Sequence, residues 1–304
     1  MLDVRRLRLL RELSHRGTIA AVAHAFSFTA SAVSQQLNVL EREAGTPLLQ
    51  RTGRGVVLTP AGHRLVGHAE AVLERLEQAA AELADVRSGL AGSVRIGAFP
   101  TAIRALLPAM LTALGDRHPA LEAMISEIDP AEVAHALRAG DLDIALLHAY
   151  DFVPAPDEAG LATEPLCVEA LYLASLSSGK TPPTDISSLA YWKNEPWITA
   201  TPGTLCHTMT VRACQAAGFT PHIRHHVDEF ATMLTLVAAG QGVAVVPHLG
   251  TADTPPTVTL TPLPIRRRTM AAYRQGARRH PAVEAAVTAL RAAVPQELAS
   301  DPVA

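Results

Sequence analysis

The first sixty residues carry apolar side chains at helical intervals and predict three short helices. Leu7, Leu10 and Leu13 fall on one face of the first helix. Thr18 and Thr29 stand where the second and third helices would begin, because a threonine hydroxyl at that position accepts a hydrogen bond from an otherwise unpartnered backbone N–H group. The pattern therefore predicts a second helix over residues 19–25 and a third that runs to about residue 44.

The predicted third helix has one apolar face and one polar face. Val33, Leu37 and Leu40 recur at the spacing of a buried face. The polar face carries short hydroxyl and amide groups without charge, namely Ser31, Ser34, Gln35 and Asn38. Such groups can hydrogen-bond to base edges in the major groove, and glutamine suits adenine. The arrangement favours a recognition helix that reads DNA. The alternative is a small helical bundle with a polar surface.

A short apolar–turn–apolar segment follows the third helix. Apolar side chains at residues 48–49 and 56–58 flank a glycine-containing turn that bears Arg51 and Arg54. The pattern predicts a two-stranded hairpin, or wing, whose arginines would contact phosphates or the minor groove. An ordinary exposed hairpin is the alternative.

Thr59 and Pro60 start a long helix, because proline suits the first helical position after a capping threonine. Apolar residues then alternate spacings of four and three, at Leu65, Ala69, Val72, Leu76, Ala79, Leu83 and Val86. A seam this regular favours pairing with the same helix of a second chain. The pair would present two recognition helices to a roughly palindromic site. Alternatively, the stripe lies on the C-terminal part of its own chain. The helix is expected to end near residues 88–89.

Strand-like and helix-like runs alternate over the last two hundred residues. Strands are expected at residues 94–97, 125–128, 143–147, 169–173 and 243–246, with a last one after residue 266. Helices are expected at residues 101–114, 130–139, 204–217 and 229–239, and another before residue 294. This alternation predicts a parallel α/β sheet with right-handed crossovers.

Charge is divided unevenly along the 304-residue chain. Residues 1–64 hold nine arginines, no lysine and four acidic residues, a net charge of +5. The remainder holds 17 basic and 25 acidic residues, a net charge of −8. A basic head on an acidic body favours a polyanionic partner for the head alone. Charge by itself does not distinguish DNA from RNA or a membrane surface.

The compartment follows from what the sequence lacks. No apolar run approaches the ~20 residues of a membrane span, and the N-terminus has no apolar core of a signal peptide. Three cysteines in a chain of this size do not make a disulfide framework. We therefore expect a cytoplasmic protein without a membrane partner.

The N-terminal residues resemble a known family. The runs TIAAVA (18–23), TASAVSQQLNVLEREAGTPLLQR (29–51) and VLTPAG (57–62) look like the DNA-binding domain of LysR-type transcriptional regulators. The resemblance implies a helix-turn-helix over residues 18–37, with Ser31, Ser34 and Gln35 as base readers, and a homodimer or a tetramer of paired dimers. Phe26 and Leu49 stand where the family usually has leucine and phenylalanine, both apolar exchanges.

The C-terminal part resembles the effector-binding half of the same family, most clearly over residues 227–247. This implies a periplasmic-binding-protein-like fold with strands crossing between two subdomains near residues 165–168 and 262–266. A small ligand would lie between them. The expected division is a winged helix-turn-helix at 1–59, a linker helix at 60–89 and an effector domain at 94–300. Subdomain I would comprise about 94–166 and 265–300, and subdomain II about 167–264.

Candidate effector contacts lie at helix N-termini that would face this cleft. Thr101 follows a proline at one, and Thr201 and Thr204 precede another. Backbone N–H groups, the helix dipole and hydroxyls together favour an anion such as a carboxylate. Phe230 could wall the pocket. Plain capping by the threonines and core packing by Phe230 are the alternatives.

Other constellations point to weaker hypotheses. Cys206-His207, His222 and His225-His226 suggest a metal site, but His222 and His225 would face opposite sides of a strand. Cys206 and Cys214 suggest a redox pair, although eight residues of helix separate their sulfurs by ~12 Å. A nucleophile elbow, a P-loop and a dinucleotide fingerprint are absent from the sequence.

The sequence thus predicts a dimeric, ligand-responsive DNA-binding regulator without catalytic residues, metal or cofactor. A solute-binding protein or α/β enzyme with an unrelated helical N-terminal domain is the main alternative. A thiol redox-sensing regulator is the minor one.

Overall fold

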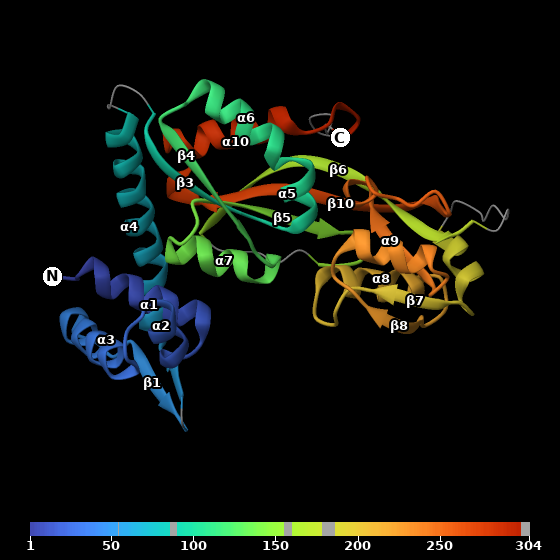
Figure 1. Cartoon of the computed structure of the whole chain (residues 1–304). Coiled ribbons are helices and arrows are strands. Elements are labelled where there is room, and N and C mark those ends of the chain that lie inside the picture. Colours follow the sequence, from blue (N-terminus) through green and yellow to red (C-terminus); the bar gives the residue numbers. More distant parts are fainter. Residues whose placement is uncertain (54, 86–89, 155–159, 178–185, 299–304) are drawn as a thin grey trace.

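The computed structural model describes residues 1–53, 55–85, 90–154, 160–177 and 186–298. Figure 1 shows three parts: a small N-terminal head, an upright helix α4 (Pro60–Asp85), and an elongated α/β body. The N-terminal helix of the head lies against α4, and α4 in turn lies along one end of the body.

The head contains the three expected helices and the expected hairpin. These are α1 (Val4–Arg16), α2 (Ile19–Ala25), α3 (Ala30–Ala44), β1 (Leu49–Thr52) and β2 (Gly55–Leu58). Gly17 and Gly45 end α1 and α3 in the left-handed conformation, with φ of 72° and 66°, where a residue with a Cβ would be strained. Leucines and valines of all three helices form one shared core.

Helix α4 packs against the head with its first turns and against the body with its later turns. Its first turns place Val66 and Ala69 in the core of the head. Its 26 residues give a length of about 39 Å, and its later turns contact the body at η3 (Gln275–Ala277). The expected end of the helix at residues 88–89 lies outside the described residues.

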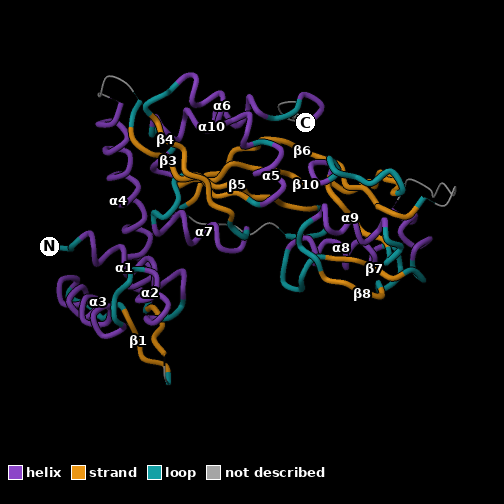
Figure 2. Tube along the Cα trace, viewed as in Figure 1, coloured by secondary structure: helices purple, strands orange, loops and turns teal. Residues whose placement is uncertain are grey.

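The body is built on one eight-stranded sheet in the order β4-β3-β5-β10-β6-β9-β7-β8. The strands are β3 (Gly92–Ala98), β4 (Leu121–Glu127), β5 (Ile144–Tyr150), β6 (Leu161–Leu176), β7 (Pro196–Thr199), β8 (His222–His226), β9 (Val243–Pro247) and β10 (Val258–Arg274). Figure 2 shows β6 and β10 running side by side from one end of the body to the other. They are the expected crossing strands, and they join two subdomains.

Helices cover the sheet, and each subdomain has its own core. Subdomain I carries α5 (Pro100–Ala105), α6 (Leu107–Arg117), α7 (Pro130–Ala139) and α10 (Pro281–Ala293). Subdomain II carries α8 (Leu205–Ala216) and α9 (Phe230–Ala238). Short 3-10 turns complete the body at η1 (Ile186–Trp192), η2 (His248–Gly250) and η4 (Gln296–Leu298).

Two expectations for the body were wrong in detail. The sheet is not parallel throughout. Strands β4, β3 and β5 are parallel to one another, as are β8, β7 and β9, but β10 runs antiparallel to β5 and β6, and β6 antiparallel to β9. The helix expected over residues 101–114 is two helices that meet at Leu106. Pro108 explains the break, since its ring lacks an N–H group and would clash with the carbonyl of Arg104 in a continuous helix.

Candidate DNA interface and effector cleft

Helix α3 presents the polar face that its sequence pattern predicts. Val33, Leu37 and Leu40 are buried in the core of the head. On the other side Ser31, Gln35 and Asn38 are exposed, and Ser34 is half-buried. The uncharged hydrogen-bonding groups therefore face outward together, whereas the neighbouring Gln36 accepts a hydrogen bond of 2.9 Å from Arg6 Nε.

The threonines at the helix starts act as caps. Thr18 Oγ1 accepts a hydrogen bond of 3.2 Å from the backbone N–H of Ala21. Thr29 Oγ1 accepts one of 3.2 Å from the N–H of Ala32 and lies 3.0 Å from Ser31 Oγ. Both threonines are exposed, so capping leaves them accessible at the surface of the head.

Phe28, in the turn before α3, is a surface residue that sequence reasoning did not single out. Its side chain is 54% exposed, although its ring stacks on Phe26 with centroids 6.4 Å apart. Ser27 adopts a φ of 54°, which turns the chain sharply before the cap of α3. The hint in the sequence was a large aromatic residue directly before a polar recognition helix.

The wing projects beside α3. Strands β1 and β2 pair from Leu49–Leu58 to Thr52–Gly55, and the Glu41 carboxylate of α3 accepts the N–H groups of Leu48 and Leu49 at 2.8 and 2.9 Å. Arg51 is exposed. Arg54 lies outside the described residues.

The apolar seam of α4 is buried in the head at its start and exposed to solvent further along. Ala69 packs within the head, and Leu65 packs partly against it. Val72 and Leu76 remain 40% and 50% exposed, and Ala79 is exposed. The side chains of Leu83 and Val86 lie outside the described residues. A different face of α4 lies on the body, where a Cβ on Gly276 would stand 2.6 Å from the carbonyl of Glu74. The alternative expectation placed the stripe itself there, but Val72 and Leu76 of the stripe are exposed.

A cleft with a cavity of about 790 Å³ opens between the two subdomains. Of the four candidate contacts, Thr101, Thr204 and Phe230 line it. Thr204 caps α8 by accepting the N–H of His207 at 3.2 Å. Thr201 instead donates from its N–H and its hydroxyl to Asp228, at 2.7 and 2.8 Å.

The floor of the cleft is a buried ion pair that sequence reasoning missed. Arg267 on β10 is 1% exposed and donates from Nε to Glu169 at 2.7 Å and from Nη2 to Thr101 Oγ1 at 3.1 Å. Its guanidinium lies 5.1 Å from the ring centre of Phe99. The sequence held a hint, because Leu263, Ile265, Arg267 and Thr269 alternate as one buried face of the strand. The middle arginine of three thus points inward.

Neutral groups surround this ion pair. Burial first, and Arg267 second, lower the pKa of His148 to about 3, so its imidazole is uncharged at neutral pH. Among the described residues, its buried Nδ1 finds no hydrogen-bond partner. Burial also raises the pKa of the Cys206 thiol, which lines the cleft, to about 11, and that of Cys214, which lies in the core of subdomain II, to about 12. Both thiols are therefore protonated.

The mouth of the cleft is acidic. Five carboxylates line it, from Glu127, Asp129, Asp228, Glu229 and Asp253. Arg104 of subdomain I pairs with Glu229 of subdomain II at 3.1 Å and also with Asp253. Asp129 and Glu229 already cap α7 and α9. Neither is an N-terminus expected to attract an anion: of those two, α8 is capped by the hydroxyl of Thr204, and α5 has no side-chain cap.

The histidine constellation assembles only in part, because the rings of His207 and His226 lie with their centres 5.8 Å apart. His222 is exposed and His225 is half-buried on the alternating faces of β8. Within the part of the chain that the structure describes, no three histidine, cysteine or acidic residues come together as metal ligands.

Comparison with known proteins decides the family. Residues 4–63 match the description "Bacterial regulatory helix-turn-helix protein, lysR family", and residues 87–295 match "LysR substrate binding domain". The chain belongs to the LysR family of transcriptional regulators. It is a DNA-binding regulator with an effector-binding domain, and its relatives are regulators rather than enzymes or solute-binding proteins.

Individual LysR relatives span most of the chain. The transcriptional dual regulator GltC of Bacillus subtilis is 26% identical over 261 residues, 85% of each chain. A probable hydrogen peroxide-inducible genes activator of Mycobacterium xenopi is 36% identical over 168 residues, 55% of this chain and 86% of its own. Among the described residues, no helix has the length and apolarity needed to cross a membrane.

Solved structures of LysR regulators share the fold. A full-length OxyR variant of Pseudomonas aeruginosa has a TM-score of 0.61 at 24% identity, covering 97% of this chain and 99% of its own. Full-length CbnR complexed with its target DNA has a TM-score of 0.56 at 22% identity, covering 96% and 100%.

Proposed function

We propose that this LysR regulator reads a roughly palindromic DNA site as a homodimer, with α3 in the major groove and the wing on the flanking backbone. The outward polar face of α3 carries the proposal. Gln35, Ser31 and Asn38 offer hydrogen bonds without charge, which is what base edges require. Ser34 would add a fourth contact to the bases. The exposed Thr18 and Thr29 would contact the sugar-phosphate backbone of the DNA.

The wing and the turn before α3 would position the helix. Arg51 and Arg54 would contact phosphates, which fixes register without reading sequence. Phe28, exposed beside the start of α3, would contact a thymine methyl group or a deoxyribose.

The proposed dimer pairs through α4. Val72, Leu76 and Ala79 form an exposed apolar stripe on a helix whose other face already rests on the body. A narrow stripe of this kind is buried by a second helix. Pairs of dimers would form a tetramer. The protein would act in the cytoplasm, where bacterial DNA lies.

The effector would bind in the cleft between the subdomains. Thr101 and the neutral His148 offer hydrogen bonds at the floor, and Phe230 supplies an apolar wall. The charge of the cleft revises the expectation of an anion. Glu169 already matches Arg267, and five carboxylates surround the mouth, so an effector whose outer end is neutral or cationic fits better. The functional units would be residues 1–59, 60–89 and 94–300.

Selection from random duplex DNA tests the function. We expect the full-length protein to enrich a palindromic site, and Gln35→Ala to relax preference at the base pair it reads, a loss of about 1–3 kcal/mol of discrimination. Gln36→Ala is the matched control, because Gln36 is held by Arg6 in the head. Equal sequence preference in the parent and Gln35→Ala would contradict the assignment of α3, and no enriched site would contradict the function itself.

A further inference from the structure

The head is attached to the body through a charged cluster on α1. Glu12 is fully buried and holds Arg11 at 2.7 Å and Arg16 at 2.9 Å. Both arginines also reach α7 of the body. Arg11 Nη2 donates to the carbonyl of Arg138 at 3.2 Å, and Arg16 Nη1 lies 3.0 Å from His135 Nε2. The buried carboxylate thus fixes two arginines in the direction of α7.

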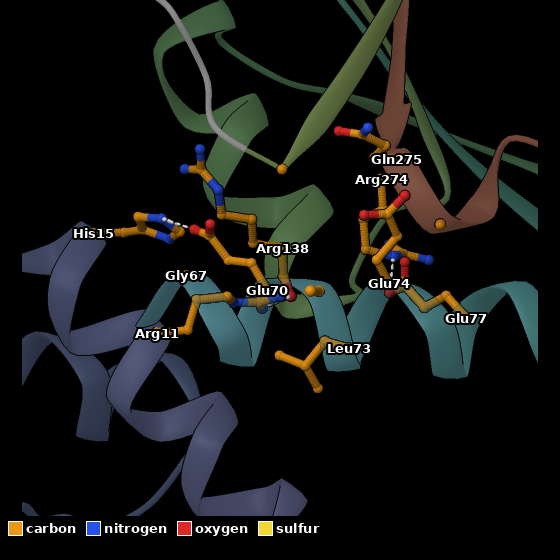
Figure 3. Close-up of a pocket in the computed structure, with 13 residues that line it drawn as sticks. Arg11, His15, Gly67, Glu70, Leu73, Glu74, Glu77, Arg138, Arg274 and Gln275 are labelled. Carbon is orange, nitrogen blue, oxygen red and sulfur yellow. Dashed lines mark hydrogen bonds and ion pairs between the residues drawn. The ribbon is translucent and has the colours of Figure 1, made fainter. Parts of the chain in front are cut away.

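A cavity of about 240 Å³ marks this junction, where α1, α4, α7 and η3 meet. Arg11, His15 and Arg138 gather at one end of the cavity, and Arg274 with Glu77 at the other (Figure 3). His15 Nε2 lies 3.5 Å from Glu70 of α4. The junction is therefore a polar contact with room to shift, unlike the close-packed cores on either side.

Arg274 ties the C-terminal end of α7 to the linker helix. It donates to the carbonyls of Leu137 and Leu142 at 2.7 and 2.8 Å, and from Nε to Glu77 of α4 at 2.8 Å. Carbonyls at the end of a helix have no partner within the helix, so a cation there is stabilising. One side chain thus connects α7, β10 and α4.

The opposite ends of α7 and β10 lie in the effector cleft. Asp129, Pro130 and Ala131 at the start of α7 line it, and Asp129 accepts the N–H of Ala131 at 2.8 Å. Ten residues of helix cover about 15 Å. On β10, Arg267 forms the floor of the cleft and Arg274 stands at the junction, about 23 Å further along the strand. Two continuous elements each join the cleft to the junction.

We propose that α7, supported by β10, transmits the state of the cleft to the DNA-binding head through the α1–α7 contact. The proposal rests on the cleft being the effector site. Displacement of the Asp129 end of α7 shifts His135 and the Arg138 carbonyl at its other end. Arg11 and Arg16 then lose their partners on α7 while Glu12 still holds them, and the head changes its position relative to α4. Two arrangements of a polar junction supply the two states that such coupling needs.

Hydrogen exchange of the full-length protein, without DNA or effector, tests the coupling. Asp129→Ala removes the cap of α7 at the cleft. The loss should make local opening of the first turn of α7 about fivefold more frequent. We expect exchange in α1 (Val4–Arg16) to accelerate severalfold as well. Thr204→Ala is the matched control, because it uncaps α8 at the same cleft but α8 does not reach the head. Acceleration in α1 with Asp129→Ala alone supports the proposal. Acceleration confined to α7, or equal effects of the two variants on α1, overturns it.

A second pair of variants tests the contact itself from the body side. His135→Ala removes the partner of Arg16 and should accelerate exchange in α1 severalfold. Glu132→Ala, an exposed change on the same helix, should leave α1 as in the parent. Unchanged exchange in α1 with His135→Ala overturns the proposal. None of these measurements involves DNA. The coupling can therefore prove wrong while the selection experiment still finds a binding site, and the selection can find no site while the coupling proves correct.

Discussion

The hydroxyl of Thr101 has two expected roles in the cleft, one in stability and one in effector binding. Its oxygen accepts a hydrogen bond from the buried Arg267, and the residue lines the cleft, where the hydroxyl can donate to an effector. Thr101→Val removes the acceptor and leaves a buried N–H group unpaired, which costs about 1–3 kcal/mol of unfolding free energy. We expect a lower melting temperature and loss of the footprint change that candidate metabolites produce in the parent. Thr101→Ser should retain both, and a full metabolite response in Thr101→Val would contradict the role of the hydroxyl.

Cys206 tests the redox alternative at the same scale. With a pKa of about 11, only about one thiol in ten thousand is the reactive thiolate at pH 7. We therefore expect hydrogen peroxide to leave DNA binding unchanged in both the parent and Cys206→Ser. A peroxide response in the parent that Cys206→Ser abolishes would establish thiol sensing in place of ligand sensing.

Helix α4 is the element on which assembly depends. Leu76 is 50% exposed at the centre of the stripe, and a glutamate there would place two like charges in the dimer seam. We expect Leu76→Glu to halve the mass of the dimer in sedimentation analysis. Arg75→Glu, an exposed neighbour off the seam, should leave the mass unchanged. A Leu76→Glu protein with the parental mass would show that α4 does not form the interface.

The same elements show what a sequence pattern can and cannot predict. Helices α1 to α3 followed from apolar spacing and caps, because local interactions decide them. The break at Leu106 was missed although Pro108 was visible. The antiparallel direction of β6 and β10 could not be read, since direction depends on pairing between residues about a hundred positions apart. The ion pair of Arg267 and Glu169 could not be predicted either, because only the folded sheet brings these two residues together.

The separation of charge between head and body determines how the whole molecule meets DNA. The head is basic, whereas the rest of the chain is acidic, so only the head should release counterions from the duplex. Binding should weaken steeply with salt, and Arg51→Ala should lower the slope of log affinity against log salt by about one. Arg278→Ala removes an arginine of the body whose side chain is 73% exposed. It should leave the slope unchanged because the body does not touch DNA. Equal slopes for Arg51→Ala and the parent would remove the wing from the interface, and a reduced slope for Arg278→Ala would place the body on the DNA as well.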